Sequence, residues 1–207
     1  VHSQSAGEIS QLVSNDWVEF SGSGALQPHA GIVLSGGSDE EVTAQSYDGF
    51  FAALQKVTFQ TFAIPTDDAE VIRAAVAFAK SMREDEGNPI QAVVAGYPQA
   101  DYEGVISVKN GVILEDGTTL SAADATAYVA GMTAGAQVNE SCTYDLYDGA
   151  VDVDEHYSNS QIISALQAGE WIFIPRNGSV VVEQDINSFT SFTADKGKTF
   201  SKNRPLR

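Results

Sequence analysis

The chain has little cysteine, little histidine and no long apolar run. Cys142 is the one cysteine among 207 residues, so an intramolecular disulfide is impossible and a reducing site of folding is favoured. No apolar stretch is long enough to cross a bilayer, and no signal-peptide pattern follows a basic start. With 43% hydrophobic residues, the sequence predicts a soluble globular protein of one large domain or slightly more.

Basic residues are also scarce, and they are unevenly distributed. The formal net charge of −17 excludes nonspecific nucleic-acid binding as a main role and disfavours binding to anionic membranes. Five of the eleven basic residues lie in residues 196–207, which contain no acid, so this stretch carries +5 and residues 1–195 carry −22. Copies could therefore associate through the basic end of one and the acidic body of another. An ordinary solvated basic end is the alternative interpretation.

The few histidines limit the chemistry that the chain can perform. Nucleophilic catalysis needs a base, and His2, His29 and His156 are the candidates. On a strand, Asp152, Asp154 and His156 would share one face and could offer ligands to a cation. This stretch lacks the glycine and the distal glutamate of a calcium loop, so a solvated acidic turn is favoured. We predict no catalytic residue, no metal site and no cofactor.

The hydrophobic pattern predicts an α/β fold. A strand at 59–64, a helix that begins at Thr66 or Asp67, and a fully apolar strand at 90–96 form a βαβ unit. Consecutive strands joined by a helix run parallel, so we expect a parallel sheet flanked by helices. In its core we expect the apolar side chains of Phe62, Ile72, Val76, Val93, Val94 and Val129.

Other elements follow from turn and capping signals. Asn110-Gly111 and Asn177-Gly178 each lie between β-rich runs and predict hairpins, because both residues tolerate positive φ. Strands are expected at 8–13, 17–22, 170–175 and 179–184, and helices at 46–57, 121–136 and 158–169.

The stretch "VVVEQDINSF", residues 180–189, places acids beside a run of valines. Alternation along a strand would send Val181, Glu183 and Asp185 to one side, which we expect to be a polar boundary. Asp185 and Asn187 can bond to backbone amides and fix the following turn. This structural role is favoured over a contact with basic residues of another subunit, and both are favoured over metal binding or catalysis.

Four stretches together are similar to a known family. Residues 29–47, 93–117, 126–141 and 180–207 resemble, in order and spacing, the tail sheath protein of contractile phage tails, in particular that of Gram-positive phages and defective prophages. The chain starts with Val and stops in a basic run, so we interpret it as a fragment that lacks both termini of such a protein.

The resemblance implies a subtilisin-like α/β sheath domain followed by the start of an α+β C-terminal domain. The expected division is 1–30 for a residual β-rich segment and linker, 31–155 for the sheath domain and 156–207 for the partial C-terminal domain. No Ser-His-Asp set appears in a matching arrangement, so the fold name implies no protease activity.

The resemblance also implies a structural subunit that polymerises around the tail tube and contracts to drive the tube forward. Its partners would be other copies and the tail tube protein, without nucleic acid or membrane, in a virion tail assembled in the host cytoplasm. The fragment itself is expected to be monomeric. The candidates for subunit contacts are Glu183, Asp185, Asn187, Lys196, Lys198, Lys202 and Arg204. The alternatives are a hydrolase of the subtilisin-like or esterase type and an acidic surface or adhesion module.

Overall fold

The computed structural model describes residues 7–16, 19–25 and 43–203. The chain divides into two compact units, Val1–Glu41 and Val42–Arg207. In the first unit, the described residues form the short 3-10 helix η1 (Ile9–Gln11) and a single antiparallel bridge between Glu8 and Ala25. The strand predicted at 8–13 is therefore wrong, because the described residues of this unit include no neighbouring strand with which it could build a sheet. Part of the strand predicted at 17–22 lies outside the described residues.

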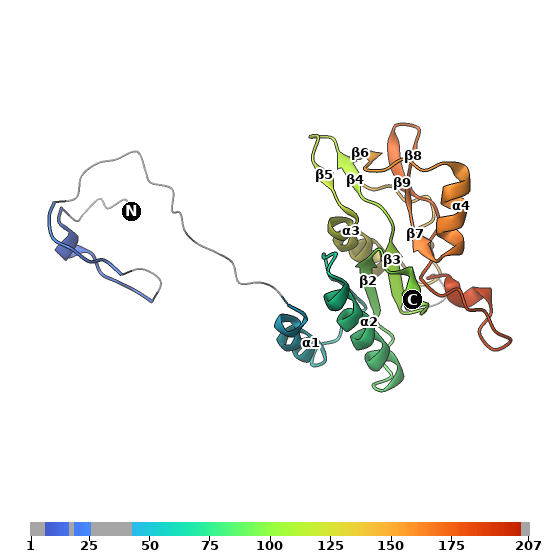
Figure 1. Cartoon of the computed structure of the whole chain (residues 1–207), viewed down its shortest axis with the longest axis horizontal. Helices are drawn as coiled ribbons and strands as arrows, with labels where there is room; N and C mark the ends of the chain where they lie inside the picture. Colours follow the sequence, from blue (N-terminus) through green and yellow to red (C-terminus); the bar gives the residue numbers. More distant parts are fainter. Residues whose placement is uncertain (1–6, 17–18, 26–42, 204–207) are drawn as a thin grey trace. The chain divides into compact units, whose positions relative to one another are not determined.

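The second unit is built on a parallel sheet of four strands (Figure 1). Its order is β1-β2-β3-β7, with β1 at Thr61–Ala63, β2 at Gln91–Ala95, β3 at Val105–Val108 and β7 at Glu170–Trp171. Every residue of β2 is buried, as expected of a central strand that is apolar on both faces. Helix α2 (Ala69–Glu84) connects β1 to β2, which confirms the predicted βαβ unit.

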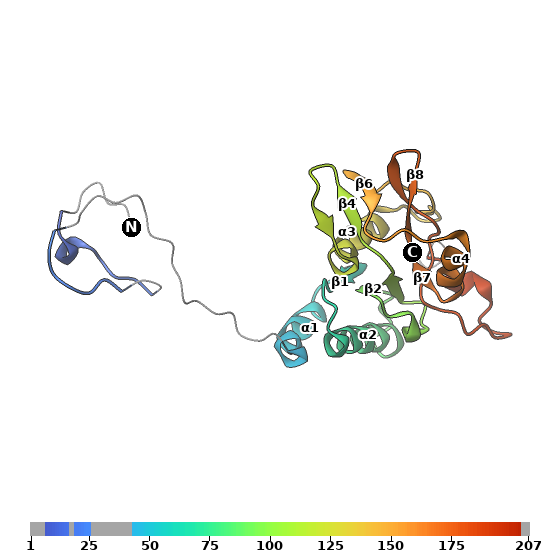
Figure 2. The ribbon, with the colours of Figure 1, turned by 45° about the horizontal axis from the view of Figure 1, so that its top comes forward.

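Helices cover both faces of this sheet (Figure 2). Alternation along β2 sends Val94 into the core cluster with α2 and Val93 into the cluster with α3 (Ala122–Gly135). The six predicted core residues are all buried. Before β1 in the chain, the 3-10 helix η2 (Ala44–Tyr47) leads into α1 (Asp48–Leu54). Phe51 of α1 stacks on Phe78 of α2, with 4.9 Å between the ring centroids.

Helix α2 begins slightly later than predicted. Its N-cap is Asp68, whose carboxylate accepts hydrogen bonds from the amides of Glu70 at 2.7 Å and Val71 at 3.3 Å. Thr66, predicted as a cap, instead accepts the amide of Asp68. The cap belongs at Asp68 because its carboxylate reaches the first unbonded amides of the helix.

Two antiparallel sheets complete the fold. One has the order β5-β4-β6, with β4 at Val112–Leu114, β5 at Thr119–Leu120 and β6 at Ala150–Val153, and the other pairs β8 (Phe173–Arg176) with β9 (Ser179–Val182). The hairpin predicted at Asn177-Gly178 is confirmed, with φ values of 54° and 80° at the turn.

The hairpin predicted at Asn110-Gly111 is wrong. Strands β3 and β4 belong to different sheets, and the chain crosses between them at this point. The Asn110 side chain bonds the backbone of Phe173 in both directions, donating to its carbonyl at 3.1 Å and accepting from its amide at 2.9 Å. This distant partner decides the path of the chain, and the local turn preference does not.

The chain after β6 adds helix α4 (Asn159–Gln167), which is capped by Ser158, and the 3-10 helix η4 (Lys198–Ser201). The 3-10 helix η3 (Pro98–Ala100) follows β2. Since β7 lies beyond residue 155 and pairs with β3, this part of the chain contributes a strand to the central sheet. The boundary at 155 stays a prediction. Within the described ranges, the helices are too short or too polar to cross a membrane.

Candidate functional site

Except for Arg204, the predicted contact residues lie in a segment that folds back onto its own domain, residues 183–203, called here the C-terminal segment. Asp185 is 3% exposed, and its carboxylate accepts hydrogen bonds from the Cys142 amide at 3.1 Å and from the side chain of Asn203 at 2.9 Å. Asn187 is fully buried, accepts the amide of Phe189 and donates to the carbonyl of Phe200. Both side chains therefore hold backbone groups of their own chain.

Asn203 is a further anchor, which sequence reasoning missed. It is fully buried and donates to Asp185 and to the carbonyl of Ile186, both at 2.9 Å. Its oxygen accepts from the side chain of Gln91, at the start of β2, at 3.0 Å. Because 112 residues separate this pair, no local spacing could have indicated it. The bonds tie the end of the segment to the central sheet.

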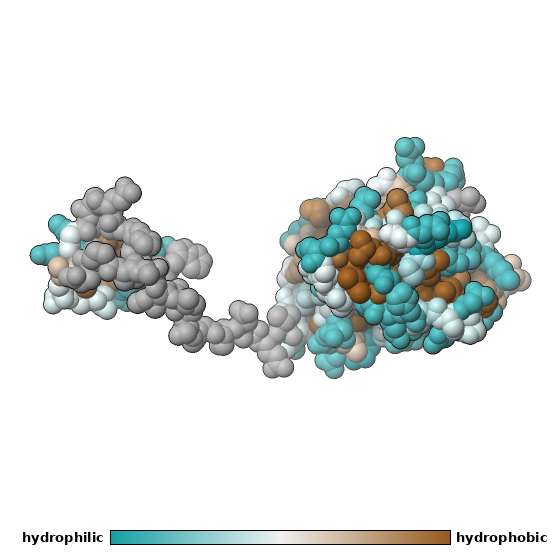
Figure 3. All heavy atoms as spheres, turned by 90° about the horizontal axis from the view of Figure 1, so that it is seen from above, coloured by the Kyte–Doolittle hydropathy of each residue, from teal (hydrophilic) through white to brown (hydrophobic). Residues whose placement is uncertain are grey.

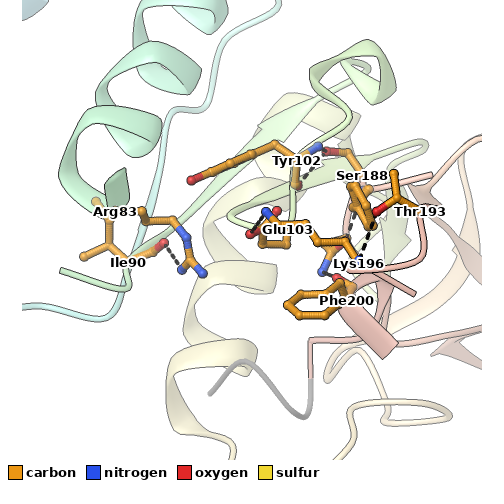
Figure 4. A network of polar contacts seen from close by, with 10 residues as sticks. Arg83, Ile90, Tyr102, Glu103, Ser188, Thr193, Lys196 and Phe200 are labelled. Carbon is orange, nitrogen blue, oxygen red and sulfur yellow. Dashed lines mark hydrogen bonds and ion pairs between the residues drawn. The ribbon is translucent and has the colours of Figure 1, made fainter. Parts of the chain in front are cut away.

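Lys196 is engaged within the chain (Figure 4). Its ammonium lies 2.7 Å from the carboxylate of Glu103 and about 6 Å from the ring centroids of Phe189 and Phe200. Burial raises the pKa of Glu103, but the hydrogen bond and the charge of Lys196 outweigh it, so the pKa lies below its ordinary value. Arg83, which donates to the carbonyl of Ile90, adds to this lowering. Glu103 was not predicted.

A second acid, Asp101, fixes the turn at Thr190 and Ser191, which comes before Lys196 in the chain. Asp101 accepts three hydrogen bonds at one carboxylate oxygen, from the amides of Thr190 and Ser191 and from the Thr190 hydroxyl. Burial works in the opposite direction, yet these bonds lower the pKa of Asp101. Asp101 was also missed, and its position in a 3-10 turn with φ of 44° is the one local sign of a special role.

The remaining candidates differ in exposure. Lys198 is exposed in η4, and Lys202 donates to the side chain of Gln184 at 3.0 Å. Burial lowers the pKa of Lys202, with a smaller opposing effect from the charge of Asp185. Glu183 is half-buried, and Arg204 lies outside the described residues.

The possible cation ligands do not form one cluster. Asp154 accepts the amide of Gly111 at 2.9 Å, whereas the His156 ring nitrogen lies 3.2 Å from the carboxylate of Asp152. In the part of the chain that the structure describes, no three His, Cys, Asp or Glu side chains are grouped as metal ligands. His2 and His29 lie outside that part. Cys142 is buried, as expected of a small apolar side chain.

The hydrogen bonds and ion pairs of these side chains stabilise the fold. Among the described residues, they do not assemble a reaction centre. His156 is 64% exposed and is paired with an acid, not with a serine or a cysteine. The parallel sheet, its two helical layers and the anchored C-terminal segment define an α/β domain. The family model for the phage tail sheath protein central domain matches residues 40–188, and the chain belongs to this family.

Relatives and solved structures agree with this assignment. The Phage-like element PBSX protein XkdK of Bacillus subtilis (strain 168) is 39% identical over the whole chain and 49% of its own length. The sheath tail protein of Desulfitobacterium hafniense is 58% identical with a TM-score of 0.86, covering 97% of this chain and 48% of that one. The sheath tail protein of Listeria innocua is 38% identical with a TM-score of 0.77, covering 99% of this chain and 48% of that one. The predicted resemblance and fold class are thereby confirmed, and the chain spans about half the length of these proteins.

Proposed function

We propose that the chain is the central part of a structural subunit of a contractile tail sheath. The subunit polymerises around a tail tube and drives it forward by contraction. The observation that carries the proposal is the match to a sheath tail protein, with a TM-score of 0.86 over 97% of this chain. Other copies and a tail tube protein are the proposed partners, in a virion tail assembled in the host cytoplasm.

The fold suits a subunit that moves as a rigid body. Both faces of the central sheet are covered, and buried hydrogen bonds hold the C-terminal segment to β2 and to the turn before β3. Packed cores resist gradual deformation, so a change between extended and contracted arrays would occur at contacts between subunits. The free energy of contraction would then come from these contacts, with no cofactor.

The proposed contact residues divide into two groups. Asp185, Asn187 and Lys196 serve inside the chain, where they fix the shape of the C-terminal segment. Lys198 and Lys202 are exposed and Glu183 is half-buried, and these three can meet another copy.

Electron microscopy tests the proposal. The gene that encodes this chain is expressed in full, alone and together with the tail tube gene of the same cluster, and the tube protein alone is the control. We expect tubes that are wider than the bare tail tube and occur in a long and a short form. A folded product that forms no tube or ring in any of these preparations would contradict the proposed function.

A further inference from the structure

Two exposed surfaces of the domain are complementary in charge. The first, called here the acidic ridge, consists of Tyr144, Asp145, Leu146 and Asp148. Tyr144 and Leu146 are large, and each is 53% exposed. The ridge borders a shallow groove of about 840 Å³ on α3, whose side is formed by the small residues Ala127 and Gly131.

Backbone hydrogen bonds hold the acidic ridge against β9. The Tyr144 amide donates to the Val182 carbonyl at 2.8 Å, and the Val182 amide donates to the Asp145 carbonyl at 3.0 Å, beside an isolated antiparallel bridge between Leu146 and Val181. The Tyr128 hydroxyl accepts the Asp148 amide at 2.8 Å. Arg176 lies over the Tyr144 ring at 4.5 Å. The backbone of the ridge and the Tyr144 ring are therefore held in place before any partner arrives, which reduces the entropy lost on binding.

The second surface, called here the basic groove, lies between α4 and the C-terminal segment. It has a volume of about 400 Å³. Apolar side chains form its walls, including Ile163 and Phe192, which are 46% and 45% exposed. Lys198 and Lys202 also line it.

The two surfaces fit each other better than either fits itself. The acidic ridge carries two exposed carboxylates beside two large exposed apolar side chains, whereas the basic groove is lined mainly by apolar side chains and carries two ammonium groups. Contact between two acidic ridges would bring four carboxylates together in a molecule that already has a net charge of −17. In the face seen in Figure 3, hydrophobic residues likewise gather in patches bordered by hydrophilic ones.

The two surfaces are formed by different elements of one copy. The acidic ridge lies beside α3, which packs on β1 and β2, whereas the basic groove is lined by α4, which packs beside β7 at the other end of the strand order. Figures 1 and 2 show α3 and α4 apart on the domain.

We propose that the acidic ridge of one copy docks into the basic groove of the next copy. Such a head-to-tail contact uses different surfaces on the two partners, so it repeats from copy to copy and generates an open helical array or a ring. The inference rests on the proposed sheath function and names the surfaces through which subunits meet.

Cross-linking of the 207-residue chain tests the contact. A Leu146→Cys protein is mixed with an Ile163→Cys protein at high concentration and treated with a short bismaleimide, and Cys142 is buried and does not compete. We expect at least about fivefold more dimer in the mixture than in either protein alone, with a yield that falls as salt rises. Val57→Cys, which replaces an apolar residue that is 54% exposed and away from both surfaces, takes the place of Ile163→Cys in the control. Equal yields in the test and control mixtures would overturn the proposal.

Charge reversal provides a second test in the same assay. Asp145→Lys and Lys198→Glu should each lower the cross-linking yield. Asp145→Lys in one partner combined with Lys198→Glu in the other should restore it. Lys56→Glu, at an exposed lysine outside both surfaces, is the control and should change the yield little. If each single variant lowers the yield but their combination does not restore it, this result would also count against the contact.

The outcomes separate the contact from the function. Sheaths in the microscope without the specific cross-link would leave the proposed function standing and reject this contact. The specific cross-link without any sheath would leave the contact standing and reject the proposed function.

Discussion

At the scale of residues, buried polar side chains specify how the C-terminal segment lies. Asp185, Asn187 and Asn203 are all at most 3% exposed, and their bonds reach Cys142, Phe200 and Gln91. When one partner of a buried hydrogen bond is removed, the other partner stays buried without water or a new partner. The free-energy cost of this unsatisfied group is larger than the net stabilisation that the hydrogen bond provides. Each of these residues therefore excludes alternative positions of the segment.

The Glu103–Lys196 pair makes the stability of the domain depend on pH. The folded pKa of Glu103 lies below its ordinary value of 4.5, so the stabilisation is present above that value and is lost as the pH falls through the folded pKa. Glu103→Gln should lower the melting temperature at pH 7. Between pH 7 and about 3.5, the melting temperature of this variant should fall by less than that of the wild type. Circular dichroism measures both curves, with the exposed Glu86→Gln as the matched control. Parallel curves for wild type and Glu103→Gln would show that the pair contributes nothing.

At the scale of elements, the same dipeptide gives two different results. Asn177-Gly178 forms a hairpin between β8 and β9, because the strands on both sides pair directly. Asn110-Gly111 joins strands of different sheets, because the Asn110 side chain bonds Phe173. Local turn chemistry therefore decides the path only where no long-range bond competes with it.

The start of α2 offers a matched pair of substitutions. Asp68 caps the helix, whereas its neighbour Asp67 is exposed and is not the capping residue. Asp68→Ala should lower the free energy of unfolding by about 1 kcal/mol, because two amides of the first turn lose their acceptor. Asp67→Ala should change it by less than about 0.5 kcal/mol. Urea denaturation of both variants checks this, and equal losses would place the cap elsewhere.

At the scale of the whole molecule, charge and fold are connected through the C-terminal segment. The sequence suggested that its basic residues meet the acidic body of another copy. Lys196 instead meets the acidic body of its own chain at Glu103, while Lys198 is exposed. One basic residue of the segment thus stabilises the fold, and the exposed Lys198 and Lys202 are available for contacts between copies.

We expect the 207-residue chain to be monomeric in dilute solution. Exposed ion pairs contribute only about 0–1 kcal/mol each, so a single contact between an acidic ridge and a basic groove is too weak to hold two copies together at micromolar concentration. Multi-angle light scattering at low and high salt measures the mass. A stable ring or tube at micromolar concentration would mean that much stronger contacts reside within this chain.

Short-range features of the protein follow from the sequence alone. Continuous apolar runs mark β2, the 3.6-residue period marks α2, and the Asn177-Gly178 turn pairs β8 with β9, because each depends on residues close together in the chain. The resemblance to tail sheath proteins likewise needs only the order and spacing of four stretches.

Only the tertiary structure decided which buried polar groups pair. Gln91 and Asn203 lie 112 residues apart, and Glu103 and Lys196 lie 93 apart, so no periodicity connects them. The same holds for the crossing at Asn110, the place of β7 in the central sheet, and the residues that come together in the acidic ridge and the basic groove. A hydrogen bond or an ion pair acts over a few ångströms, and chain folding, not sequence distance, determines which groups come within that range.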